Sequence, residues 1–165
     1  MTETDRIPLD SEFWLRPQMG NVHELLTELI AREDLKSEDI SRFIANLDRT
    51  GDEMELEYFP TIPYLLDLFE AEPEKLRGSL INFSGSLFKP SAPPPDEYWN
   101  PVLAQRDRIG RVFFDALCAR RSDLDWIGPS MAESEFVVAC IAGIAAVFTD
   151  PDEALKIYRG YMEIE

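Results

Sequence analysis

The sequence predicts an all-α fold of about seven helices stacked as antiparallel pairs. Apolar residues recur along most of the chain at the i, i+3, i+4 and i+7 spacing of a helix face, and no stretch reads convincingly as a strand. The apolar positions of residues 22–47 also recur 40 residues later, which is typical of stacked helix pairs. With 165 residues, we expect a single all-α domain, residues 1–165, with its own core.

Residues 1–21 are expected to form an irregular N-terminal arm, because two prolines and a glycine interrupt helical patterns there. Phe13 and Trp14 then pin this arm to the body. Two amphipathic patterns follow, with Asn21 and Ser37 as their N-caps. The connection between these helices is so short that they must form an antiparallel hairpin.

A second hairpin follows an acid-rich turn and completes residues 22–88. Its third helix begins near Pro60-Thr61, and Glu72-Pro73 separates it from a fourth helix that runs to about Phe88. Both helices keep the phase of the first hairpin. The matching pairs are Val22/Ile62, Leu25/Leu65, Leu26/Leu66, Leu29/Phe69, Ile40/Leu80, Phe43/Phe83 and Leu47/Leu87.

This pair of hairpins resembles the HEAT repeat family. The second hairpin matches the family pattern through Pro63, Leu65, Leu66, Leu68, Glu72-Pro73, Leu76-Arg77, Gly85 and Leu87. The first hairpin keeps the apolar positions but lacks the proline and the arginine. The resemblance implies a short HEAT-like α-solenoid and says little about activity.

The second half of the chain interrupts the period. Residues 89–99 form a proline-rich, extended connection, and three further helices are expected over residues 100–165. The first begins at Asn100-Pro101, runs to about Arg121 and exposes three arginines, Arg106, Arg108 and Arg111. The second contains Phe136–Phe148, which is uncharged and too short to span a bilayer, so we expect it to be the most buried helix.

Charge excludes several classes of function. The chain has 32 acidic and 16 basic side chains, for a formal net charge of −16. A field of this sign repels nucleic acid and anionic membranes and attracts basic surfaces. The N-terminal residues lack the basic start and apolar run of a signal peptide, and Cys118 and Cys140 lie in apolar helices as reduced thiols. We therefore expect a cytoplasmic monomer or weak dimer.

Catalytic and metal-binding patterns are missing from the sequence. His23 is the only histidine, and its position in a first helical turn favours a surface or capping role. The two cysteines lack a zinc spacing, and no glycine-rich phosphate loop or nucleophile motif occurs. The sequence thus predicts no catalytic residue, no cofactor and no metal, and a protein that is not an enzyme.

Three acidic segments are the candidate partner-binding residues. Two of them set carboxylates beside an indole, an arrangement that binds arginine- or lysine-rich surfaces through stacking and salt bridges. The alternative is that each tryptophan packs on the body to hold its loop. The candidates are Asp52, Glu53, Glu55 and Glu57, then Asp96, Glu97, Tyr98 and Trp99, then Asp123, Asp125 and Trp126.

The hypothesis that follows is a non-catalytic acidic module that recognises a basic protein. Short HEAT-like bacterial proteins of this kind resemble immunity proteins of toxin systems, which implies a basic toxin domain, such as a nuclease, as the partner. Two alternatives stay open. One is an adaptor or assembly factor, and the other is a HEAT-like enzyme such as a DNA glycosylase, although that activity needs a basic concave face, which a net charge of −16 opposes.

Overall fold

The structure, a computed structural model, consists of helices joined by turns and irregular segments in the part of the chain that it describes. The described residues are 6–47, 56–87, 95–122, 140–141 and 144. Within them lie six α-helices and several short 3-10 helices, and no strand. This confirms the predicted all-α class and is compatible with an α-solenoid-like arrangement. A seventh helix and strict antiparallel stacking stay predictions.

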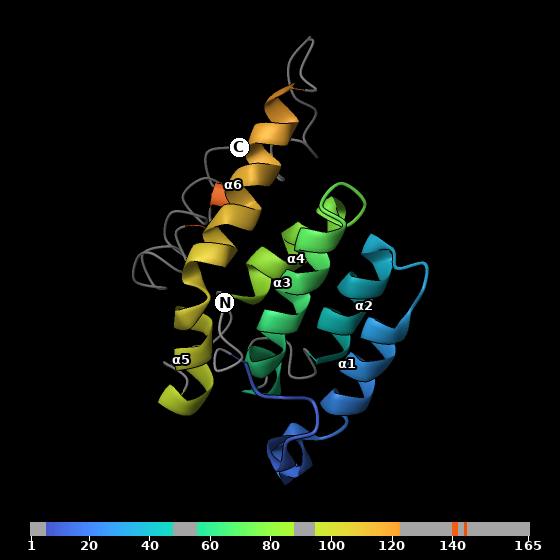
Figure 1. The fold of residues 1–165 in the computed structure, drawn as a ribbon, viewed down its shortest axis with the longest axis vertical. Coiled ribbons are helices and arrows are strands. Elements are labelled where there is room, and N and C mark those ends of the chain that lie inside the picture. The colour runs from blue at the N-terminus through green and yellow to red at the C-terminus, as the bar shows by residue number, and fades with distance from the viewer. Residues whose placement is uncertain (1–5, 48–55, 88–94, 123–139, 142–143, 145–165) are drawn as a thin grey trace.

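The helices lie side by side in three neighbouring groups. Figure 1 shows α3 and α4 in the middle, with α1 and α2 on one side and α5 and α6 on the other. The contacts agree, since α2 packs on α4 and α3 packs on both α5 and α6. The helices are α1 (Val22–Ala31), α2 (Ser37–Leu47), α3 (Ile62–Ala71), α4 (Leu80–Ser86), α5 (Asp96–Ala104) and α6 (Arg106–Ser122).

The 40-residue pattern marks the core. Of the fourteen side chains in the seven matching pairs, all are buried except Leu25, which is half-buried. The inward positions of these pairs are therefore confirmed, whereas Ile30, which follows the same helical spacing in the first helix, is 38% exposed. The 40-residue pattern of buried positions also includes Met19 and Phe59, which are both fully buried just before α1 and α3.

The N-terminal arm is held on the body by side chains that bond to its backbone. It contains two 3-10 turns, Glu12–Leu15 and Pro17–Met19, and ends at Gly20, whose positive φ of 52° favours glycine. Trp14 is buried, and its indole N–H donates to the carbonyl of Pro8 at 2.9 Å. His23 Nε2 lies 2.7 Å from the carbonyl oxygen of Leu9. Trp14 thus pins the arm as predicted, and His23 helps to hold it.

The predicted helix caps were wrong in detail. Asn21 occupies the N-cap position of α1 but makes no capping bond with its side chain. Ser37 is the first residue of α2, and its hydroxyl donates to the carbonyl of Lys75 at 3.0 Å. The capping bond comes instead from Asp39, whose Oδ2 accepts from the Lys36 N–H at 3.0 Å. The Ser37 hydroxyl thus bonds to a distant part of the chain and not to the start of its own helix.

The fourth helix is shorter than predicted. Turns and a 3-10 helix, Arg77–Ser79, replace its expected first half, and α4 begins only at Leu80. The 3-10 helix packs closely on α2: a Cβ added at Gly78 would lie 3.3 Å from Ser37 Oγ. Glycine is a weak α-helix former, which is consistent with a 3-10 turn here in place of an α-helix.

The predicted start of the fifth helix was also wrong. Helix α5 begins at Asp96, because the carbonyl of Pro95 accepts from the N–H groups of Tyr98 and Trp99, and acids in the first turn favour a helix N-terminus. Pro101 then lies inside the helix. The helical pattern breaks at Gln105, so the single helix expected from Asn100 to Arg121 is divided into α5 and α6.

Three phenylalanine rings join the groups of helices at the centre. Phe83 of α4 lies 5.2 Å from the ring of Phe69 in α3 and 5.6 Å from that of Phe113 in α6. All three side chains are buried.

The helix expected around Phe136–Phe148 lies largely outside the described residues. Within it, Cys140 is a buried thiol, as predicted, but Ile141 is 47% exposed, so this segment is not buried on every side. The side chain of Cys118 lies outside the described part.

Candidate functional site

Most of the predicted binding residues lie outside the described part of the structure. This holds for Asp52, Glu53, Glu55, Asp123, Asp125 and Trp126. Glu57 lies in the 3-10 helix Leu56–Thr61 that precedes α3, and its side chain is not among those described. A partner-binding role for these residues stays a prediction.

The predicted binding segment Asp96–Trp99 is helical and does not belong to an extended connection. Asp96 and Glu97 are exposed in the first turn of α5, whereas Tyr98 is only 4% exposed. The half-buried indole of Trp99 packs edge-on against Phe59, with ring centroids 5.5 Å apart, so it packs on the body as the alternative interpretation predicted. Glu97 forms an ion pair with Arg16 at 2.7 Å. This segment therefore exposes its two carboxylates more than its rings.

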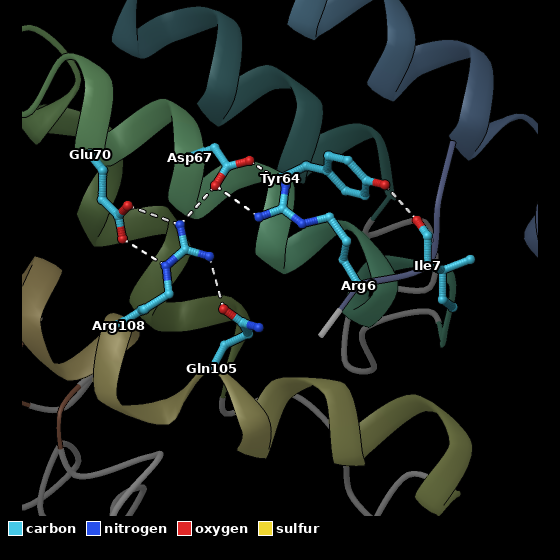
Figure 2. Close-up of polar contacts among 7 residues, drawn as sticks. All are labelled: Arg6, Ile7, Tyr64, Asp67, Glu70, Gln105 and Arg108. Atoms are coloured by element: carbon cyan, nitrogen blue, oxygen red, sulfur yellow. Dashed lines mark hydrogen bonds and ion pairs between the residues drawn. The ribbon is translucent and has the colours of Figure 1, made fainter. Parts of the chain in front are cut away.

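A polar cluster that the sequence did not predict lies where the arm, α3 and α6 meet (Figure 2). Asp67 of α3 sits between two arginines: Arg6 of the arm donates to both of its oxygens, and Arg108 of α6 donates to Oδ1 at 2.8 Å. The guanidinium of Arg6 also stacks 5.1 Å from the centre of the Tyr64 ring. Tyr64 in turn donates its hydroxyl to the carbonyl of Ile7. One carboxylate thus links three distant segments.

Arg108 is the most heavily bonded side chain of this cluster. Besides Asp67, it reaches both oxygens of Glu70 at 2.8 and 2.9 Å and the side-chain oxygen of Gln105 at 2.8 Å. Partial burial alone would lower the pKa of Arg108, but the hydrogen bonds to Glu70 and Asp67 outweigh burial and raise it. The arginine is therefore firmly charged, and its charge is neutralised inside the protein.

The carboxyl group of Asp67 is shifted in the opposite sense. Burial favours the neutral acid and would raise its pKa, but the hydrogen bonds from Arg6 and Arg108 dominate, so the pKa of Asp67 lies below its ordinary value. At neutral pH the arrangement therefore holds an anion between two cations. It links the arm, α3 and α6 through charge-assisted hydrogen bonds.

A groove opens beside this cluster, between the α3–α4 connection and α6. Its volume is about 470 Å³. The floor is apolar, formed mainly by Phe69, Leu80, Val112 and Ala116. Charged residues of both signs surround it: Glu70, Glu74, Arg77, Arg108, Arg111 and Asp115. The combination of an apolar floor and a charged rim suits binding.

Sequence reasoning missed the cluster because its members look like ordinary surface residues. Asp67 and Glu70 are spaced i, i+3, which indicates one helix face but not a partner on another helix. Arg108 was expected on an exposed face with Arg106 and Arg111; the other two are exposed, but Arg108 is half-buried.

Replacing Asp67 by Asn tests this electrostatic description. At neutral pH we expect the free energy of unfolding to fall by about 1–2 kcal/mol, a modest loss because the carboxylate is partly exposed. Since the pKa of Asp67 is lower in the folded than in the unfolded state, its stabilisation is fully present above about pH 4 and is lost as the pH falls through the folded value. Urea unfolding at several pH values should therefore show wild type and Asp67→Asn converging in acid. A constant difference would contradict the assignment.

Among the described residues, no group of three or more His, Cys, Asp or Glu side chains could hold a metal ion. No helix in that part is both long and apolar enough to cross a membrane. No protein-family model, curated protein or solved structure matches the chain.

Proposed function

We propose that the chain is a non-catalytic, acidic protein-binding module that recognises a basic protein partner. The observation that carries this proposal is where the excess acid lies. Of the aspartate and glutamate side chains that the structure describes, only Asp39 and Asp67 are half-buried, and the others are exposed. With 32 acidic against 16 basic side chains, the chain presents a negative surface to its surroundings.

The buried part of the structure is consistent with a binding scaffold. The polar cluster pairs Arg6 and Arg108 with Asp67 and Glu70, so its four charges balance and the excess acid of the chain lies outside it. A basic partner would be attracted over a distance and held by direct contacts after encounter.

The finer proposal is that the chain is a HEAT-like, cytoplasmic immunity protein. The 40-residue period and the matching buried positions support the HEAT-like part. The immunity part is an association between short acidic solenoids and toxin systems. In this proposal the partner is a basic toxin domain, for example a nuclease, whose cleft is covered by the acidic surface.

The test begins with the basic proteins encoded beside this chain. One of these proteins should inhibit cell growth when it is expressed alone. Co-expression of this chain should restore growth, and the two purified proteins should form a complex. If no neighbouring product is toxic and the captured partners are acidic or neutral, the immunity proposal fails.

Charge reversal then tests which acidic surface of the chain meets the basic partner. Changing Asp52, Glu53 and Glu55 to Lys should slow association with the partner about tenfold, because like charges would meet at the encounter. A control that reverses Glu24, Glu28 and Glu38, which are exposed on α1 and α2, changes the net charge equally. Surface plasmon resonance should show a smaller effect for the control. Equal effects would mean that only total charge matters, and no effect in either would count against recognition through acidity.

A further inference from the structure

The contact between the arm and α3 has the composition of an arginine-binding site, and the chain's own Arg6 occupies it (Figure 2). The guanidinium donates to both oxygens of Asp67 and lies 5.1 Å from the centre of the Tyr64 ring. A carboxylate that accepts two N–H bonds, beside an aromatic face, favours arginine over lysine. The Tyr64 hydroxyl also donates to the carbonyl of Ile7, so the site binds one side chain and one main-chain group.

Both groups that receive Arg6 belong to α3. Tyr64 and Asp67 are three residues apart, so the helix places them on one face whether or not the arm is there. The other arginine of the arm is held differently: Arg16 stacks on Phe13 of the arm itself and forms its ion pair with α5. Of these two sites, the one on α3 is the one that stays assembled when its arginine leaves.

The arm is fixed to the body by more than Arg6. Trp14 and Met19 are buried, and the Trp14 indole donates to the carbonyl of Pro8 at 2.9 Å. The pair of Arg6 and Asp67 is partly exposed, with 19% and 43% of the two side chains accessible, and pairs of this kind stabilise a fold only modestly. Arg6 can therefore leave Asp67 while the arm stays in place from Pro8 onward.

The polar cluster becomes negative when Arg6 leaves it. Arg6 and Arg108 together balance Asp67 and Glu70. Without Arg6, one arginine faces two carboxylates. The vacated site then attracts a cation, and the net charge of −16 on the chain favours its approach.

We propose that Asp67 and Tyr64 form an arginine-binding site for the basic partner, and that Arg6 is an internal placeholder that an arginine of the partner displaces. The partner's guanidinium takes the two bonds to Asp67 and stacks on the Tyr64 ring. A main-chain carbonyl next to that arginine takes the bond that Ile7 now accepts. This inference rests on the proposed function and names what the partner presents to this surface, an arginine and not a lysine.

The probe is a short capped peptide with one arginine–isoleucine step. It is compared with peptides in which lysine or citrulline, a neutral analogue of arginine, replaces the arginine. Binding is followed by NMR titration of isotope-labelled protein, through the amide signals of Tyr64 and Asp67. The decisive pair of variants is Arg6→Ala and Arg16→Ala. Each removes one positive charge from the arm, but only Arg6 occupies the site on α3.

We expect Arg6→Ala to bind the arginine peptide about tenfold more tightly than wild type, because a modest internal contact leaves the site open only about a tenth of the time. Arg16→Ala should stay within about twofold of wild type, since its site does not bind the probe. The lysine peptide should bind Arg6→Ala more weakly than the arginine peptide, and the citrulline peptide should not bind. Adding Asp67→Asn to Arg6→Ala should abolish binding. Circular dichroism shows whether each variant is folded, and the citrulline comparison keeps the test valid if the double variant does not fold.

Two results with the peptides would overturn the inference. One is an Arg6→Ala variant that binds the arginine peptide no more tightly than wild type, and the other is equal binding of the arginine and citrulline peptides. The captured partner separates this failure from that of the proposed function. Association that slows in salt, with an affinity that Arg6→Ala leaves unchanged, would keep recognition of a basic partner and remove this site. Absence of any basic partner, together with no gain in peptide binding, would count against both.

Discussion

Replacing Phe83 by Ala is expected to lower the free energy of unfolding by about 3–5 kcal/mol, the largest effect of any change considered. The Phe83 side chain is fully buried, and its ring contacts those of Phe69 and Phe113. Truncation therefore removes buried apolar surface and leaves a cavity where α3, α4 and α6 meet. Urea unfolding followed by circular dichroism measures the loss.

Phe114→Ala is the matched control for this prediction. It removes the same ring from α6, but Phe114 is 59% exposed, so we expect a change of about 0.5 kcal/mol or less. If the two substitutions cost the same, the three rings Phe69, Phe83 and Phe113 do not form the centre of the core.

Replacing Arg108 by Ala is expected to cost about 2–3 kcal/mol in the free energy of unfolding. The arginine side chain is only 18% exposed and donates to Asp67, Glu70 and Gln105. Its removal leaves the buried Gln105 without this donor and Glu70 without its two-pronged partner, although Asp67 keeps Arg6. The estimate lies below the range for a fully buried pair because both carboxylates are partly exposed.

Two variants distinguish the effect of the hydrogen-bond geometry of Arg108 from the effect of its positive charge. Arg108→Lys keeps the positive charge but cannot bond to Glu70 with two parallel N–H groups, so it should recover less than half of the loss. Arg111→Ala removes an exposed arginine of the same helix and should change stability by about 0.5 kcal/mol or less. Full recovery by lysine would show that the geometry of the network is unimportant.

The buried faces were predictable because helical periodicity directly reports which side chains face the core. Leu26 and Leu66, Phe43 and Phe83 were assigned inward from spacing alone, and all four are buried. Helix ends were less predictable. Ser37 and Pro101 follow local rules for starting a helix, but contacts with Lys75 and the earlier cap at Pro95 override these rules.

The polar cluster could not be predicted from sequence for a related reason. Asp67 and Arg108 are 41 residues apart, and Asp67 and Arg6 are 61 apart. A carboxylate on a helix face looks the same in the sequence whether it faces solvent or another helix. Only the packing of α6 and the arm on α3 turns these surface-like residues into a network.

The central claim, that exposed acidity directs the recognition of a basic partner, is tested most directly by the association rate across a salt series. Attraction between exposed charges is screened beyond roughly 8–10 Å at physiological ionic strength. With the captured partner, the logarithm of the association rate should therefore fall steeply as salt rises, while the dissociation rate changes little. An association rate that is independent of salt, with an affinity unaffected by reversal of the exposed carboxylates, would contradict the account.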